Sequence, residues 1–95
     1  MKDLKNKKAI ITGGGRGLGK ATAIAFAKEG IDIAITGRNE AVLNETVSEL
    51  EAFGINAMYS VFDVSRYEDV RSGIRSIVNT LGSVDILVNN AGIAA

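Results

Sequence analysis

Three observations predict an α/β fold built on a parallel sheet. Short apolar segments of strand length alternate with longer segments of helical periodicity along the 95 residues. Glycines stand at the expected ends of three helices, at Gly30, Gly54 and Gly82, and mark a strand–helix unit that occurs three times. The segment Ile31–Thr36 is apolar except for Asp32, which is typical of a strand that is covered on both faces.

The first half of the chain contains two strands and two helices. We expect a strand at Lys8–Thr12, a glycine-rich turn, and a helix at Gly17–Lys28 whose many alanines allow it to approach a sheet closely. The second strand is expected at Ile31–Thr36. Asn39 is a suitable N-cap for a second helix that runs to Phe53.

The second half adds a third unit and one more strand. The third strand is expected at Ala57–Phe62, and Ser65 with Glu68 matches a capping box that would begin the third helix. The apolar residues of that helix predict one buried face: Val70, Ile74, Ile77, Val78 and Leu81. The fourth strand is expected at Ile86–Val88.

This alternation predicts a partial Rossmann (doubly wound) fold, with a parallel four-stranded sheet in the order 3-2-1-4. Right-handed crossovers would place the first two helices on one face and the third on the other. We interpret residues 1–95 as one incomplete domain of this kind. The glycine-rich turn and Asn89–Gly92 should meet at the switch point, where such sheets bind ligands. Asp32 and Asp85 occupy surface-like positions beside strands and are interpreted as structural.

The fourth strand would form an open edge of this sheet, beside a face that a single helix covers. Exposed edges and apolar patches favour association between chains. We therefore expect the isolated chain to be marginally stable or to self-associate as a homo-oligomer.

The composition excludes several classes of function. Eleven Lys and Arg balance eleven Asp and Glu, so no basic surface for nucleic acid is indicated. The absence of Cys and His removes thiolate metal sites, a cysteine nucleophile and the usual general base, and no metal site is predicted. No apolar run approaches a membrane span, and the N-terminus lacks a signal core. A cytoplasmic protein with no membrane partner is expected.

The glycine-rich turn after the first strand is the main functional signal. A strand, a glycine turn and a helix N-terminus together form a binding site for a phosphate or pyrophosphate. The general dinucleotide pattern G-x-G-x-x-G fits in no register. The P-loop pattern fits until Ala21, which replaces the required Ser or Thr. The pattern T-G-x-x-x-G-x-G fits in full at Thr12, Gly13, Gly17 and Gly19. A purely structural turn remains an alternative.

This pattern, with Asp63-Val64 after the third strand and N-N-A-G at Asn89–Gly92, resembles the short-chain dehydrogenase/reductase family over residues 4–93. The resemblance is strongest to the group that includes 3-oxoacyl-acyl-carrier-protein reductases and glucose- or sorbitol-type dehydrogenases. It implies that Asp63 accepts a hydrogen bond from adenine, Val64 packs on adenine, and residues 90–92 line the ribose and nicotinamide. The expected cofactor-binding residues are Gly13, Gly15, Arg16, Gly17, Leu18, Gly19, Arg38, Asp63, Val64, Asn90, Ala91 and Gly92. For Asp63, a turn-forming role is the alternative.

The end of the second strand predicts NADP rather than NAD. NAD-binding folds place an acid roughly 20 residues beyond the glycine turn. Thr36 and Gly37 occupy that place, and the next residue is Arg38. Arg38 and, to a smaller extent, Arg16 are expected to contact the 2′-phosphate of NADP. For Arg16, a solvated loop charge is the alternative.

Catalytic residues are not expected in this chain. The Ser and the Y-x-x-x-K pattern of the family would lie beyond Ala95. Tyr67 and Arg71 imitate the spacing, but arginine does not lose its proton as a tunable group. We therefore interpret the chain as the cofactor-binding portion of an NADP-dependent oxidoreductase that acts on a small carbonyl or alcohol, without turnover of its own. A non-catalytic nucleotide-binding fragment is the alternative, and a P-loop phosphotransferase is a remote one.

Overall fold

The computed structural model describes residues 4–90. In chain order its elements are β1 (Lys8–Thr12), α1 (Gly17–Lys28), β2 (Asp32–Gly37), α2 (Glu40–Glu51), β3 (Ala57–Val61), α3 (Tyr67–Leu81) and β4 (Ile86–Asn89). Every predicted element is present, and the predicted ends differ from these bounds by at most two residues. Within the described residues, no helix has the length and apolar character that crossing a membrane requires.

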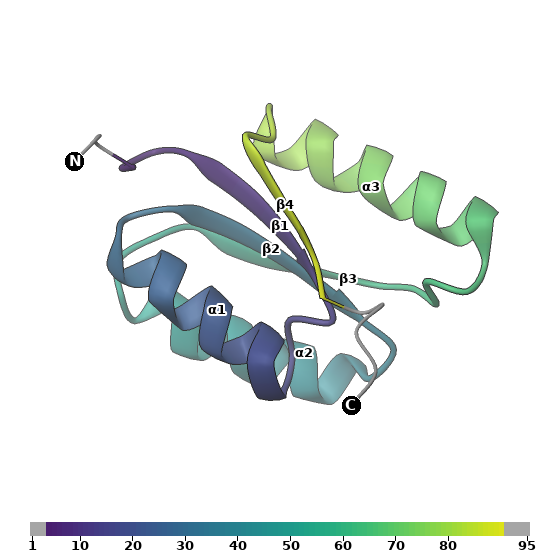
Figure 1. Cartoon of the computed structure of the whole chain (residues 1–95), viewed down its shortest axis with the longest axis horizontal. Coiled ribbons are helices and arrows are strands. Elements are labelled where there is room, and N and C mark those ends of the chain that lie inside the picture. The colour runs from purple at the N-terminus through teal and green to yellow at the C-terminus, as the bar shows by residue number, and fades with distance from the viewer. Residues whose placement is uncertain (1–3, 91–95) are drawn as a thin grey trace.

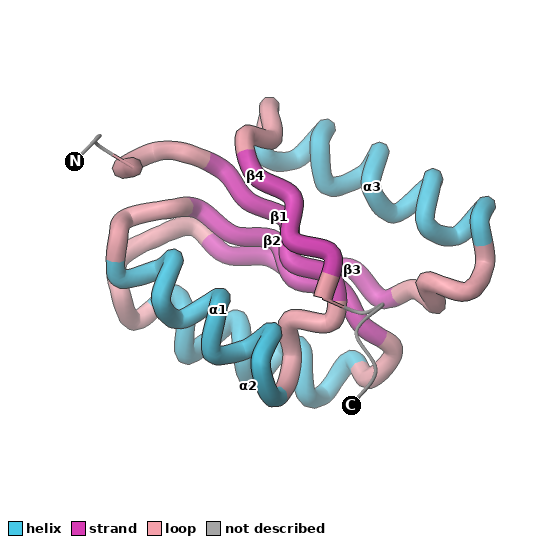
Figure 2. Tube along the Cα trace, viewed as in Figure 1, coloured by secondary structure: helices cyan, strands magenta, loops and turns pink. Residues whose placement is uncertain are grey.

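The four strands form one parallel sheet in the predicted order β3-β2-β1-β4 (Figure 1). β1 therefore has a partner on each side, and its last residue, Thr12, lies opposite both Thr36 of β2 and Asn89 of β4. Helices α1 and α2 cover one face and α3 lies on the other (Figure 2). The loops that follow β1, β2 and β4 consequently meet at one end of the sheet.

The larger core lies between the sheet and helices α1 and α2. Ile11, Ile33 and Ile35 are fully buried there. From α1, Ala23 and Ala27 pack against these strands, and their small side chains let the helix lie close to the sheet. This is the packing that the alanine-rich sequence predicts.

A smaller core lies under α3. Ile77 packs with Ile10 and Phe62, and a Cβ at Gly73 would overlap the ring of Phe62. The helix thus approaches the sheet most closely along the line of Gly73 and Ile77. Val78 lies one position further round the helix and is 37% exposed, so its predicted place on the buried face is wrong.

The two later helices begin differently. The Asn39 side chain accepts a hydrogen bond from the Val42 N–H at 3.2 Å, which confirms the predicted N-cap of α2. The predicted capping box of α3 is wrong, because its N-cap is Arg66, whose side chain makes no cap hydrogen bond. The Ser65 hydroxyl instead donates to Oδ1 of Asp63 at 2.8 Å. Asp63 lies two residues earlier, in the loop that precedes α3.

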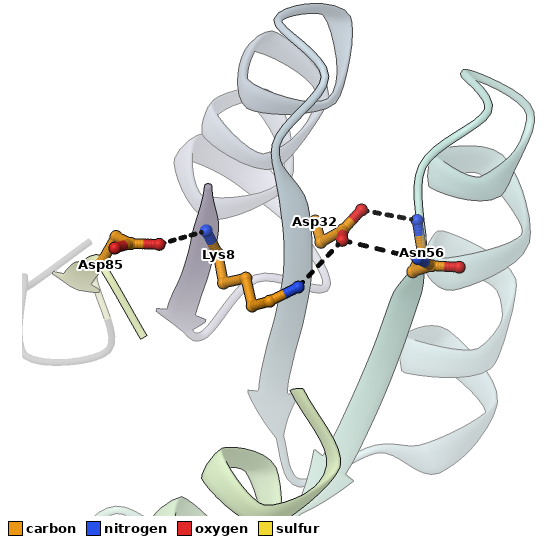
Figure 3. Close-up of polar contacts among 4 residues, drawn as sticks. All are labelled: Lys8, Asp32, Asn56 and Asp85. Atoms are coloured by element: carbon orange, nitrogen blue, oxygen red, sulfur yellow. Dashed lines mark hydrogen bonds and ion pairs between the residues drawn. The ribbon is translucent and has the colours of Figure 1, made fainter. Parts of the chain in front are cut away.

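Polar side chains connect the amino ends of the strands (Figure 3). Asp32 accepts hydrogen bonds from the Asn56 N–H at 2.9 Å and from Lys8 Nζ at 3.3 Å. Asp85 accepts from the backbone N–H of Lys8 at 2.9 Å. The structural role predicted for both acids fits these contacts, but Asp32 is only 8% exposed, so its predicted surface-like position is wrong. A buried carboxylate needs such partners, because burial alone would disfavour its charge.

The edge strand β4 exposes an apolar side chain. Within the described residues, β4 pairs only with β1. Leu87 is aligned with Ile10 and therefore points toward the α3 side of the sheet, yet it remains 62% exposed. Leu87 and the free edge of β4 together form a surface that favours association.

Replacing Asp32 by asparagine tests the amino-end network. Burial opposes ionisation of Asp32, but hydrogen bonds from Asn56 and Lys8 outweigh it, so the pKa of Asp32 lies below its usual value. At pH 7 we expect the free energy of unfolding to fall by about 1.5–3 kcal/mol, the usual contribution of a hydrogen bond to a charged group. The depressed pKa means that this stabilisation is complete above the unfolded pKa of about 3.9 and is lost as the pH falls through the folded pKa.

Urea unfolding of wild type and Asp32→Asn at pH 7 and at pH 3 measures the effect, and the difference should be smaller at pH 3. Glu45→Gln removes an exposed carboxylate from α2 and serves as the control, with an expected change within about 0.5 kcal/mol. Equal stability of wild type and Asp32→Asn at pH 7 would contradict the assigned role.

Leu87→Lys tests the exposed edge. Burying a leucine contributes about 1.5–3 kcal/mol, so the substitution should weaken self-association about tenfold or more. Sedimentation velocity over a range of concentrations measures it. Leu18→Lys changes an equally exposed leucine (64% against 62%) away from β4 and is the matched control. A wild-type chain that stays monomeric at every concentration would show that this edge does not associate.

Candidate functional site

The glycine-rich turn is bonded to the end of β2. The N–H groups of Gly13 and Gly14 both donate to the carbonyl of Thr36, at 2.9 and 3.2 Å. Gly13 has φ = 71° and Gly17 has φ = 55°, values that disfavour residues with a side chain. At Gly17 a Cβ would meet nothing within 4 Å, so conformation alone explains glycine there.

Two other glycines are required by close packing. A Cβ at Gly14 would lie 2.5 Å from Cγ2 of Ile35, inside the core. At Gly19, in the first turn of α1, a Cβ would overlap the Gly13 carbonyl oxygen and lie 2.7 Å from Nδ2 of Asn90. The turn and the start of α1 can lie this close to the sheet only because these positions lack side chains.

Helix α2 holds the turn from the other side. The hydroxyl of Thr46, a residue only 1% exposed, donates to the carbonyl of Gly15 at 3.1 Å. Lys20 of α1 forms an ion pair with Glu49 of α2 at 2.8 Å. Nothing in the local sequence pattern indicated the Thr46 contact, because its partner lies 31 residues earlier in the chain.

The end of β4 meets the turn as the predicted topology requires. The Thr12 hydroxyl donates to Oδ1 of Asn89 at 3.0 Å, and Nδ2 of Asn90 donates to the Gly13 carbonyl at 3.4 Å. Asn89 is therefore bonded to the last residue of β1, and Asn90 is bonded to the turn itself. Ala91 and Gly92, also predicted to contact the cofactor, lie outside the described residues.

A cleft of about 650 Å³ opens beside the turn, at the carboxyl ends of β1, β2 and β3. Six of the predicted residues line it: Gly13, Gly15, Arg16, Arg38, Asp63 and Val64. The structure does not place the other four described residues in its wall, namely Gly17, Leu18, Gly19 and Asn90. A single cleft therefore collects residues from three loops that are far apart in the sequence.

The cleft has further wall residues that the sequence analysis did not assign to the site: Thr36, Gly37, Asn39, Val42, Leu43, Phe62 and Ser65. Thr36, Gly37 and Phe62 end or directly follow strands, and that position is a signal which could have identified them. Val42 and Leu43 belong to the cleft wall because of the way α2 packs on the sheet, and no local sequence pattern reveals that packing. The Thr36 hydroxyl is buried and has no hydrogen-bond partner within the described part of the chain.

The charges at the cleft favour an anion. Arg16 and Arg38 are exposed, and neither forms an ion pair within 4.0 Å with any of residues 4–90. Their guanidinium groups are accordingly available to a ligand. Arginine binds phosphate through two parallel N–H donors, so two such residues beside a glycine turn fit a ligand with more than one phosphate.

Asp63 is the acid in the cleft wall, and it forms a local turn. Its Oδ1 accepts from the N–H of Ser65 at 2.9 Å and from the Ser65 hydroxyl at 2.8 Å. These hydrogen bonds hold the pKa of Asp63 below its usual value, and the nearby charge of Arg38 acts in the same direction. The turn-forming role considered for Asp63 is thus present, and its contact with adenine remains a prediction.

Comparison with known proteins identifies relatives over nearly the whole chain. The model of the short chain dehydrogenase family matches residues 7–95. The short-chain dehydrogenase/reductase homolog YusS of Bacillus subtilis (strain 168) is 46% identical over 89 residues, which are 93% of this chain and 82% of that protein. The 3-oxoacyl-[acyl-carrier-protein] reductase FabG of Staphylococcus epidermidis is 36% identical over 89 residues, 93% of this chain but only 36% of that protein.

Solved structures share the fold. An NAD⁺-bound xylitol dehydrogenase superposes with a TM-score of 0.92 at 35% identity, over 97% of this chain and 35% of the other. The L-sorbose reductase of Gluconobacter frateurii, complexed with NADPH and L-sorbose, gives 0.90 at 37% identity, over 99% and 37%. The chain therefore spans little more than a third of these two proteins.

Thr46→Val tests how α2 holds the turn. The substitution keeps the shape but leaves the Gly15 carbonyl without its donor, so the free energy of unfolding should fall by about 0.5–1.5 kcal/mol. Amide hydrogen exchange over residues 13–17 should become faster. Thr46→Ser keeps the hydroxyl and is the matched control. Equal exchange rates in the valine and serine variants would rule out the hydroxyl as the restraint.

Proposed function

The chain belongs to the short chain dehydrogenase family, and we propose that it forms the dinucleotide-binding portion of an NADP-dependent oxidoreductase. One observation carries the choice of NADP. Arg16 and Arg38, from two separate loops, line the same cleft as the glycine turn, and neither is paired with an acid within residues 4–90. Two guanidinium groups that form no ion pair there favour a ligand with an additional phosphate.

Electrostatics supports this proposal over NAD. The 2′-phosphate of NADP carries close to two negative charges, whereas NAD has a neutral hydroxyl at that position. The cleft has Thr36 and Gly37 where an NAD site would hold an acid, and Arg38 follows them in its wall. A hydrogen bond to a charged group contributes about 1.5–3 kcal/mol, and 1.4 kcal/mol corresponds to a factor of ten in affinity.

We assign the remaining residues as follows. The glycine turn and the start of α1 bind the pyrophosphate through backbone N–H groups and the helix dipole. Val64, which is 43% exposed at the cleft, packs on the adenine, and Asp63 accepts a hydrogen bond from it. Asn90, with Ala91 and Gly92, lines the ribose and nicotinamide side. When bound, the nicotinamide would supply or accept the hydride.

For the whole protein we propose a small carbonyl or alcohol substrate. A 3-oxoacyl group carried on acyl-carrier protein is the specific candidate, supported by the identity to the staphylococcal reductase. General acid–base chemistry would have to come from residues that this chain does not contain, since hydride transfer to a carbonyl needs a proton donor near the developing alkoxide.

A non-catalytic nucleotide-binding protein is the second candidate. The B. subtilis homolog favours it, because this chain covers 82% of that protein's length. A thermal shift with NADP, without turnover of any carbonyl or alcohol tested, would support this candidate. Steady consumption of NADPH by the pure chain would exclude it.

Arg38→Asp tests the choice of cofactor. Wild type should bind NADP more tightly than NAD by about tenfold or more, and the variant should lose or reverse this preference, because an acid repels the phosphate and accepts a hydrogen bond from a hydroxyl. Titration calorimetry with both cofactors measures the ratio.

Arg75→Asp makes the same charge change on the exposed surface of α3 and should leave that ratio unchanged. If wild type binds NAD at least as tightly as NADP, or if Arg38→Asp keeps the wild-type ratio, the assignment of Arg38 is wrong.

A further inference from the structure

Gly73 lies in the middle of α3, although its backbone conformation does not require a glycine. Its φ is not positive, unlike that of the glycines in the turns and at the helix ends. Glycine weakens the interior of a helix, whereas alanine is the best helix former. Gly73 is also buried, on the side of α3 that packs on the sheet. The space around this position, and not its conformation, therefore explains the glycine.

The aromatic ring of Phe62 fills the space beside Gly73. A Cβ at position 73 would overlap Cδ2 and Cε2 of this ring and would lie 3.2 Å from its Cγ. The ring packs in the smaller core with the buried side chains of Ile10, Ala34 and Ile77. Because a packed core has little free volume, the ring cannot move further in that direction.

Phe62 belongs to the wall of the cleft as well as to the core. Its backbone is fixed at the end of the sheet, because its N–H donates to the Gly37 carbonyl at 3.0 Å. Asp63 and Val64, the residues assigned to adenine, follow it directly and line the same wall. The residue is only 7% exposed. Among residues 4–90, the cleft is therefore the open space into which a displaced ring would move.

We propose that Gly73 is a positioning residue for cofactor binding, because the missing side chain lets the Phe62 ring lie against α3 and outside the adenine end of the cleft. This inference rests on the proposed function and adds to it a residue that does not itself line the cleft. A side chain at position 73 would push the ring toward Asp63 and Val64. The ring would then occupy volume that the adenine needs.

Gly73→Ala tests the proposal with two ligands that occupy different parts of the cleft. Adenosine 5′-monophosphate (AMP) carries the adenine, whereas inorganic pyrophosphate needs only the arginines and the glycine turn, whose hydrogen bonds do not involve α3. NMR titrations of the ¹⁵N-labelled 95-residue chain measure both dissociation constants. Gly73→Ala should weaken AMP binding about fivefold or more, because a filled core absorbs added volume only by displacement, and should leave pyrophosphate binding unchanged. Ser72→Ala, at the neighbouring exposed position, is the matched control and should change neither constant.

Phe62→Leu provides a rescue experiment. Leucine has no ring for a methyl group at position 73 to displace, so Phe62→Leu combined with Gly73→Ala should bind AMP as tightly as Phe62→Leu alone. The combined variant should also unfold at a higher urea concentration than Phe62→Leu, because the alanine then acts only as a better helix former. Should Gly73→Ala alone fail to fold, the comparison of these two variants still decides the proposal.

The outcomes distinguish this inference from the proposed function. If wild type binds neither AMP nor NADP, both are overturned. If wild type binds both ligands but Gly73→Ala binds AMP as tightly as wild type, or weakens AMP and pyrophosphate equally, the inference alone is wrong. A loss of AMP affinity when Gly73→Ala is added to Phe62→Leu would also overturn it, because the glycine would then act on the cleft without the ring.

Discussion

The position of β1 between β2 and β4 is the constraint on which the rest of the structure depends. Parallel pairing on both sides aligns Thr12 with Thr36 and with Asn89, so three loops leave the sheet at the same end. The glycine turn can then bond to the Thr36 carbonyl on one side and to the Asn90 side chain on the other. Without a central β1, the turn would lose both neighbours.

The turn is held in place before any ligand arrives. Thr36, Thr46 and Asn90 each bond to a different part of it, and glycine at positions 14 and 19 allows the close packing. Such preorganisation reduces the conformational entropy that binding would otherwise cost. The two arginines differ from this restrained backbone, because their exposed side chains are free to adjust to a phosphate.

The two ends of the sheet have different physical roles. At the amino end, Asp32 and Lys8 satisfy one another together with Asn56, so their charges are used within the fold. At the carboxyl end, Arg16 and Arg38 remain unpaired within residues 4–90. Charges that are paired within the fold are not available to a ligand, whereas exposed guanidinium groups without an ion pair are. Helix α2 contributes to the carboxyl end, since Thr46 restrains the turn and Val42 and Leu43 form part of the cleft wall.

The sequence by itself determined the elements, their order in the sheet and the loops that meet at the cleft. Periodicity, glycines at helix ends and the Asn39 cap are local features, and right-handed crossovers leave few ways to arrange such units. These local features did not determine which side chains bond to one another. Ser65 was expected to cap α3 but bonds to Asp63, and Asp32 was expected near the surface but is buried. The bonds from Thr46 to Gly15 and from Tyr59 to Glu40 join residues 31 and 19 positions apart. Only the tertiary structure decided these contacts, because they depend on the tilt and closeness with which α2 and α3 pack on the sheet, which no local pattern specifies.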